Sequence, residues 1–217
     1  MQVFCLDKPM NYWLRRLSIG IVLILLPLLT ILRIRQSPMG AAFKLSPARI
    51  KGDPKARLTI YEYSDFQCPS CAAVRPAVDR LLELYQGKIR LAYKYNPLTH
   101  IHHNALSAAH AAQCAAEQNQ FWTYENKLFT TQTQWAPLTD ATTSFFTMAQ
   151  EISLNQEQFK ICYQDVNQRL LITEDMKEAE NLDIHSTPTF IIGDDRLIGG
   201  LIESDGARVI EKALRNQ

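Results

Sequence analysis

Apolar and polar positions divide the chain into an apolar segment near the N-terminus and a longer part with mixed patterns. Residues 17–32, sixteen in all, contain no charged side chain, and arginines flank them on both sides. A helix of that length spans roughly 24 Å, slightly less than a hydrocarbon core of about 30 Å, and flanking arginines reach the interface. We therefore expect a transmembrane anchor within residues 14–35. A cleaved signal sequence is the alternative, and both interpretations export the rest of the chain.

The pattern predicts four regions in the order of the chain. They are a cytoplasmic tail (1–13), the anchor or signal sequence (14–35), a linker rich in Pro, Gly and Ser (36–48) and a globular domain (49–217). The domain is long enough to bury one apolar core.

The globular domain opens with a strand, a helix and a second strand. Residues 57–64 are apolar and β-prone, residues 69–85 have apolar side chains at helical spacing, and residues 88–95 alternate. This order predicts two parallel strands joined by a right-handed crossover.

Helical patterns then fill the middle of the domain, and short strands return near its end. Residues 103–181 are helical in pattern almost throughout. We predict a strand at 189–192, a turn at 193–195, a strand at 196–198 and a closing helix at 204–215 capped by Ser204. The predicted fold is α/β, a small mixed sheet with an all-helical insertion at about residues 100–182.

Charge and cysteine content narrow the class of protein. With 23 basic and 22 acidic residues the net charge is +1, which gives no general attraction to nucleic acid, and we expect no such partner. Cys5 precedes the apolar segment, whereas Cys68, Cys71, Cys114 and Cys162 follow it. An even number of exported cysteines suits an oxidising compartment.

The sequence Cys68-Pro69-Ser70-Cys71 stands where a predicted strand gives way to a helix. Unpaired N–H groups and the helix dipole favour a thiolate at Cys68, and the thiolate is the nucleophile. Pro69 suits the first helical turn because its missing N–H is not needed there. We expect an exposed Cys68 to form a mixed disulfide that Cys71, one turn further on, resolves.

The cysteines also allow two other interpretations. A CxxC pair is also half of a zinc site, but Cys114 and Cys162 are isolated and form no second pair, so we expect no metal and no cofactor. A non-enzymatic metal-binding protein remains the alternative of a different class. Ser186-Thr187-Pro188 adds weight to the redox interpretation, because a proline directly before a strand is a special backbone position.

Together these features resemble the DsbA-like thioredoxin superfamily, the bacterial exported thiol:disulfide oxidoreductases with a helical insertion. The resemblance covers about residues 50–217. Its residues are Glu62 and Phe66 before the Cys68–Cys71 motif, Thr187-Pro188 before a strand, and the alanine-rich stretch from Ala108 to Trp122.

The resemblance implies further roles for particular residues. Pro188 should be cis and lie against the cysteine pair, with the Thr187 backbone pairing with an extended substrate near Pro69 and Ser70. Glu62 matches a buried acid that carries the Cys71 proton, although a surface glutamate on an edge strand is the alternative. Cys114 and Cys162 match a second, structural disulfide of some relatives.

The expected function is that of a membrane-anchored enzyme that forms or exchanges disulfides in exported proteins. The resemblance also implies a membrane redox partner, a quinone-linked oxidase or an electron donor, and a single-pass location in the bacterial inner membrane with the catalytic domain facing the periplasm. Reduction or isomerisation of disulfides is the alternative direction, because Ser70 stands where the strongest oxidants have histidine.

Overall fold

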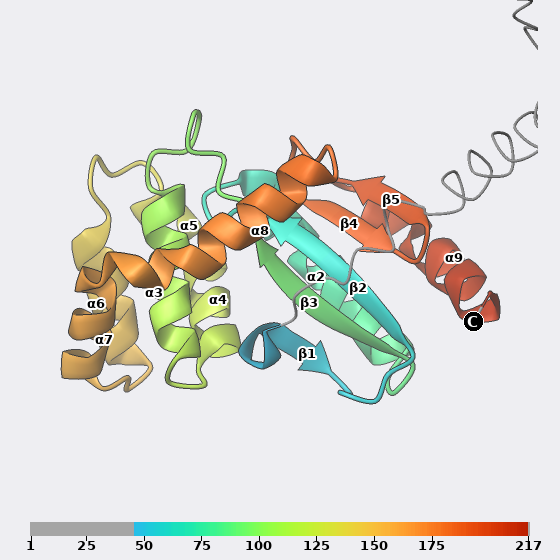
Figure 1. The fold of residues 1–217 in the computed structure, drawn as a ribbon, viewed down its shortest axis with the longest axis horizontal. Coiled ribbons are helices and arrows are strands. Elements are labelled where there is room, and N and C mark those ends of the chain that lie inside the picture. Colours follow the sequence, from blue (N-terminus) through green and yellow to red (C-terminus); the bar gives the residue numbers. More distant parts are fainter. Residues whose placement is uncertain (1–45, 217) are drawn as a thin grey trace, which may run out of the picture. The chain divides into compact units, whose positions relative to one another are not determined.

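The computed structural model describes residues 46–216, which form a five-stranded sheet with helices on both faces (Figure 1). The strands lie in the order β1-β3-β2-β4-β5. Their bounds are β1 (Ile50–Gly52), β2 (Leu58–Ser64), β3 (Ile89–Tyr95), β4 (Thr189–Ile192) and β5 (Asp195–Ile198).

The predicted strand–helix–strand unit is confirmed. β2 and β3 pair in parallel, and α2 (Pro69–Leu84) connects them. β4 pairs antiparallel with both β2 and β5, so β2 is the central strand. The carboxyl end of β2 therefore leads directly into the loop that carries the cysteine pair.

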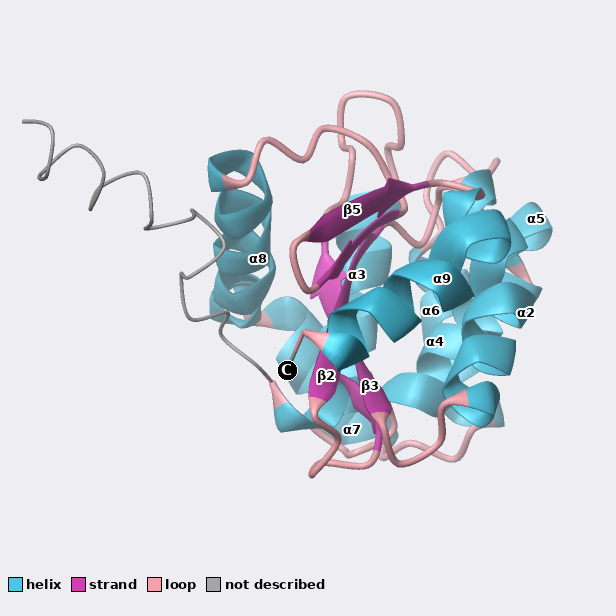
Figure 2. Cartoon of the chain, turned by 90° about the vertical axis from the view of Figure 1, so that its right-hand side faces the viewer, coloured by secondary structure: helices cyan, strands magenta, loops and turns pink. Residues whose placement is uncertain are grey.

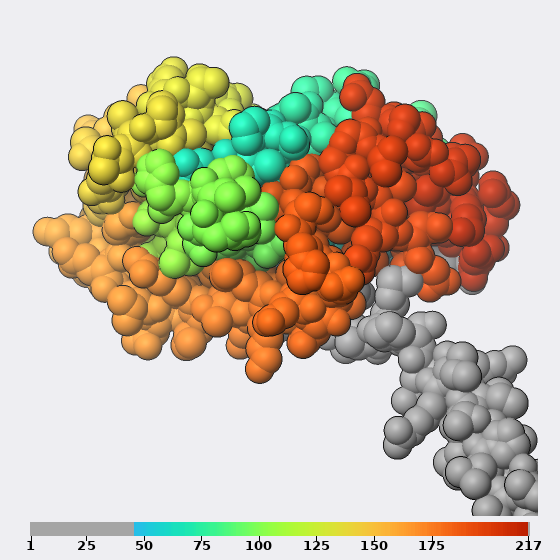
Figure 3. Space-filling model, turned by 90° about the horizontal axis from the view of Figure 1, so that it is seen from above, coloured from blue at the N-terminus to red at the C-terminus, as the bar shows by residue number. Residues whose placement is uncertain are grey.

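The insertion between β3 and β4 is helical, as predicted. Its elements are α3 (Ala105–Ala116), α4 (Phe121–Thr130), α5 (Gln132–Trp135), α6 (Thr142–Glu151), α7 (Gln156–Gln164), η3 (Val166–Arg169) and α8 (Leu170–Asn181). Asn155 caps α7 by accepting a hydrogen bond from the Gln158 N–H. In the space-filling view the insertion, green to orange, packs directly against the teal and red segments of the sheet part (Figure 3).

Opposite faces of the sheet carry different helices (Figure 2). α2 and α9 (Leu201–Arg215) pack together on one face, and α8 contacts β3 on the other. Successive strand residues point to opposite faces, so Glu62 faces α2 whereas Tyr63 faces α8. This alternation gives each face its own set of charged side chains.

Two buried apolar clusters hold these layers together. One lies between the sheet and the helices α2 and α9, and it includes Ile60, Val78 and Ile210. The other fills the insertion and extends to the cysteine loop, where the rings of Phe66 and Tyr93 stack with centroids 5.1 Å apart. The insertion therefore shares its core with the cysteine loop.

Two details differ from the predictions. The strand β1 was not predicted, because three residues are too few for an alternating pattern; it pairs antiparallel with β3 and follows a 3₁₀ turn at Pro47–Arg49. The last helix begins at Leu201 with Gly200 as its N-cap, so Ser204 lies inside the first turn and is not the cap. Ser204 is a preferred N-cap residue type, and nothing in residues 201–203 indicates that the helix begins before it.

The predicted tail, the anchor and most of the predicted linker lie outside the described residues. Within residues 46–216, no helix combines the length and apolarity that crossing a bilayer requires.

Candidate active site

Cys68 is the N-cap residue of α2, directly after the turn that leaves β2. Pro69 is the first helical residue, and both Pro69 and Ser70 are exposed. The first N–H groups of a helix have no partner within the helix, so they point toward the Cys68 sulfur. The described chain contains Cys68 and Cys71 as free thiols, which is the reduced state of the pair.

The surroundings of Cys68 favour its thiolate. A hydrogen bond from the Cys71 thiol lowers the pKa of Cys68 to about 5, against an ordinary value of 9.0. Hydrogen bonds from the backbone N–H groups of Cys71 and Ser70 act in the same direction, whereas burial opposes them. At neutral pH the sulfur of Cys68 is therefore ionised and ready to react.

Cys71 has the opposite character. It is fully buried, and burial together with its hydrogen bond to Cys68 raises its pKa well above the ordinary value. The Ser64 hydroxyl lies at its sulfur and weakly favours the thiolate. Cys71 thus holds a proton that it must release before it attacks.

The loop before β4 covers the cysteine pair. The Thr187–Pro188 peptide bond is cis, and the Cys68 Sγ lies 3.3 Å from the Thr187 carbonyl oxygen. Cys68 is consequently 7% exposed, which is less than the open position we predicted. Thr187 itself is 9% exposed.

Three polar residues that the sequence analysis did not identify fix the cysteine loop. Asp65 accepts hydrogen bonds from the N–H of Gln67, at 2.8 Å, and from the N–H of Leu98, at 2.9 Å. Gln132, on α5 of the insertion, donates to the carbonyls of Phe66 and Cys68 at 2.7 and 3.0 Å. Gln67 donates to the Ala136 carbonyl at 2.8 Å. The insertion therefore helps to hold the nucleophile in place.

Glu62 lies on the central strand and is completely buried, so the edge-strand alternative is wrong. Its Oε2 accepts a hydrogen bond from Arg75 Nη1 at 2.8 Å, whereas its Oε1 has no hydrogen-bond partner among residues 46–216. Burial, followed by the charges of Glu62 and Cys71, raises the pKa of Tyr93. Glu62 and Cys71 therefore lie near the same buried tyrosine.

The other two cysteines among residues 46–216 form a disulfide at a different place. Cys114 of α3 and Cys162 of α7 are bonded, with 5.7 Å between their Cα atoms. The imidazole of His110 has a nitrogen within 4.8 Å of these sulfurs. Since the sulfurs are bonded to each other, they are not available as thiolate ligands.

Comparison with known proteins begins with a family model described as thioredoxin, which matches residues 45–212. Among solved structures, alpha-DsbA1 from Wolbachia pipientis superposes with a TM-score of 0.71 at 23% identity, covering 83% of this chain and 97% of that one. DsbA2 from Pseudomonas aeruginosa gives 0.64 at 23% identity, covering 78% and 96%. BdbD from Bacillus subtilis gives 0.69 at 18% identity, covering 77% and 92%.

A curated relative is larger than this chain. The Na(+)/H(+) antiporter NhaA 3 of Salinispora tropica is 32% identical over 147 residues, which are 68% of this chain and 22% of the antiporter. The chain thus spans about a fifth of the length of that relative.

Proposed function

The chain belongs to the thioredoxin family and has the DsbA-like form of its fold, and from this premise we propose that it exchanges disulfides with exported proteins through Cys68 and Cys71. The observation that carries this proposal is the contrast within the pair. Cys68, at the start of α2, has a strongly lowered pKa, and Cys71 is buried with a raised one.

The reaction transfers two electrons from a substrate dithiol to the oxidised pair. A substrate thiolate attacks the Cys68 sulfur, the Cys68–Cys71 bond breaks, and Cys71 leaves and takes up a proton. The second thiolate of the substrate then attacks the substrate sulfur that is bonded to Cys68. The substrate disulfide forms, and Cys68 is released as a thiolate. The lowered pKa of Cys68 makes it the better leaving group in this last step.

The loop over the pair supplies a place for the substrate. We assign the Thr187 backbone to strand pairing with an extended substrate and Pro188 to packing against the reacting sulfurs, with Pro69 and Ser70 on the exposed rim. We assign to Glu62 the role of accepting the Cys71 proton. Its Oε1 is a buried acceptor that has no hydrogen-bond partner among residues 46–216.

The direction of exchange follows from how strongly the thiolate is stabilised. In thioredoxin the reactive cysteine has a pKa of about 7, and the disulfide has a reduction potential of about −270 mV. In DsbA the corresponding pKa is about 3.5 and the potential about −120 mV. The pKa of Cys68, about 5, lies between these two values, so we expect a potential between those of thioredoxin and DsbA and net oxidation or exchange. A potential near about −270 mV would instead support the reductase alternative.

We also propose that residues 14–35 hold the protein in the inner membrane with the domain in the periplasm. The uncharged run of residues 17–32 supports an anchor, and the reactive pair suits an oxidising compartment. A membrane redox partner, quinone-linked in the oxidising direction, would return the pair to its working state.

Trapping with Cys71→Ser tests the function. This variant cannot resolve the mixed disulfide, so covalent adducts with cysteine-containing exported proteins should accumulate and disappear on reduction. Cys68→Ser is the matched control, since it removes the nucleophile and leaves Cys71. Equal adduct yields from both variants, or none from Cys71→Ser, would refute the proposed function.

A further inference from the structure

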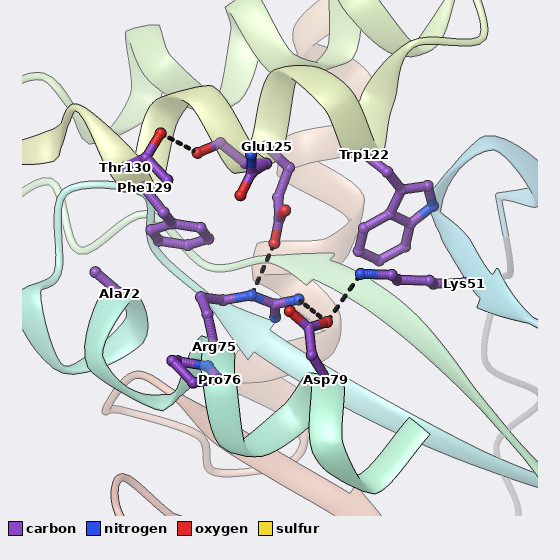
Figure 4. Close-up of a pocket in the computed structure, with 10 residues that line it drawn as sticks. Lys51, Ala72, Arg75, Pro76, Asp79, Trp122, Glu125, Phe129 and Thr130 are labelled. Atoms are coloured by element: carbon purple, nitrogen blue, oxygen red, sulfur yellow. Dashed lines mark hydrogen bonds and ion pairs between the residues drawn. The ribbon is translucent and has the colours of Figure 1, made fainter. Parts of the chain in front are cut away.

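A cavity of about 450 Å³ lies between α2 and α4, beside Lys51 of β1 (Figure 4). α2 contributes Ala72, Arg75 and Asp79 to its lining, and α4 contributes Trp122, Glu125 and Phe129. Pro76 of α2 and Thr130 of α4 also line the cavity, and both are exposed. The cavity therefore connects the interior beside the cysteine helix with the surface.

Arg75 is the centre of the charges beneath this cavity. Its Nη1 lies 2.8 Å from Glu62 Oε2, and its Nε lies 3.0 Å from Glu125 Oε1. Glu62 is 0% exposed and Glu125 is 3% exposed. One buried guanidinium thus serves two buried carboxylates, one from the central strand and one from the insertion.

The other charged groups around Glu125 lie further out. Asp79 Oδ1, also on α2, is 3.8 Å from Arg75 Nη2, and it pairs with Lys51 of β1 at 2.8 Å. The side chains of Lys51 and Asp79 are 40% and 45% exposed, so water screens them. Lys51 and Asp79 nearly cancel, and the deep part of the cluster retains one positive and two negative groups.

A buried cluster with a surplus carboxylate favours binding a proton. Burial raises the pKa of Glu125 to about 7, the charge of Glu62 adds to the rise, and Arg75 opposes it. Glu125 lines the cavity, whereas Glu62 is sealed below Arg75. Glu125 is therefore the carboxyl group through which this cluster gains or loses a proton.

We propose that Glu125 is a positioning residue for the attack of Cys71 on a mixed disulfide at Cys68, which is the reverse of the first step of substrate oxidation. Glu125 shares Arg75 with Glu62 and so sets how readily Glu62 accepts the Cys71 proton. In the reaction of the reduced pair with a disulfide, this attack by Cys71 is the second step. This inference rests on the proposed function. When Glu125 is ionised, Arg75 divides its positive charge between two carboxylates, and transfer of the Cys71 proton to Glu62 is favoured. When Glu125 is neutral, Arg75 stabilises the Glu62 carboxylate alone, and the proton transfer is less favourable.

The step balances as follows. The proton moves from Cys71 Sγ to Glu62 Oε1, and the Cys71 thiolate attacks the Cys68 sulfur of a mixed disulfide. A new Cys68–Cys71 bond forms, the bond from Cys68 to the partner breaks, and the partner's sulfur leaves as a thiolate. The partner is reduced, and the pair is oxidised.

Single-turnover kinetics with oxidised glutathione test this inference on the full-length reduced protein. The first released glutathione reports the attack by Cys68, and the second reports the attack by Cys71. In the wild type, the second rate should rise with pH through a midpoint near 7. Glu125→Gln should remove this inflection and slow the second step at pH 8 about tenfold, which corresponds to one unit of pKa.

Matched variants keep the result interpretable. Glu157→Gln changes an exposed glutamate on α7 and should match the wild type. Glu125→Asp keeps the carboxyl group and should restore an inflection, even if Glu125→Gln folds poorly. The first step should be unchanged in all three variants.

Three outcomes would overturn the inference, and a fourth would refute the proposed function as well. An unchanged pH profile in Glu125→Gln, or an Asp variant without any inflection, contradicts the role of Glu125. If Glu62→Gln retains the wild-type second step, the role of Glu62 fails, and that of Glu125 fails with it. A wild-type protein that releases no glutathione would instead refute the proposed function itself.

Discussion

Two sets of buried charges lie on opposite faces of β2 and β3, and they differ in their balance. On the α8 face, Arg49 and Lys94 meet Asp175 and Glu178, so two cations face two carboxylates. On the α2 face, Arg75 alone faces the buried pair Glu62 and Glu125.

The difference separates a structural network from a reactive one. The balanced set joins β3 and the turn before β1 to α8, and Asp175 also accepts a hydrogen bond from the Tyr95 N–H at 3.1 Å. Because each charge there has an opposite partner, a proton is not needed for neutrality. The unbalanced set lies beside the redox helix and binds a proton near neutral pH.

The largest effect is expected from removing Asp175, which tests whether the charges on the α8 face are structural. Asp175→Ala removes the carboxylate beside the buried Arg49 and one of the two carboxylates beside Lys94, and we expect the unfolding free energy to fall by about 3–5 kcal/mol. Urea denaturation measures this change. Asp175→Asn keeps an acceptor of the same shape and should lose less. A loss below about 1 kcal/mol for the alanine variant would mean that the network is not structural.

Removal of Arg75 should have a smaller effect that depends on pH. In Arg75→Met the two carboxyl groups lose their cation but can become neutral by binding protons, so we expect a loss of about 1–3 kcal/mol at pH 7. Their pKa values in the folded variant are then raised above the unfolded values. Stability of the variant should therefore fall as the pH rises through the folded values, and urea denaturation at pH 5 and pH 8 measures the difference. Equal losses at both pH values would contradict the comparison.

The smallest change is expected in the pKa of Cys68, which depends on the Cys71 thiol and on backbone N–H groups in the first turn of α2. The ultraviolet absorbance of the Cys68 thiolate, followed against pH, should give a midpoint near 5 in the wild type. In Asp175→Asn or Arg75→Met this midpoint should shift by less than about one pH unit. Folding lowers this pKa from 9.0, so the reduced protein gains stability that is complete above pH 9 and is lost as the pH falls through 5. A large shift in Asp175→Asn would show that the α8 face takes part in the chemistry.

Local sequence patterns predicted the part of the fold that carries the cysteines. The strand and helix around Cys68 follow from apolar spacing, and the helical start follows from Pro69. The short strand β1 was missed because its pairing with β3 involves partners about 40 positions apart, whose contact leaves no local pattern.

The sequence predicted the cysteine pair of the candidate site but not the charged residues that lie around it. Glu62 had two interpretations from sequence, and the strand order excludes the one on an edge strand by placing β2 in the centre of the sheet, whereas its role toward the Cys71 proton stays a prediction. Arg75 resembles any helical arginine, and Glu125 lies 50 residues further along the chain. Neither residue type nor spacing reveals that the two meet, because that contact depends on how α4 packs against α2.

The bond between Cys114 and Cys162 closes a covalent ring of chain that contains α4, α5 and α6. Glu125 and Gln132, the two side chains that the insertion lends to the active site, both belong to this ring. A protease that cut the loop between α5 and α6 would therefore open the ring without separating it into two molecules. The disulfide would keep the two fragments covalently joined, so the C-terminal fragment, which carries Thr187 and Pro188, would stay attached to the fragment that carries Cys68, Arg75 and Glu125.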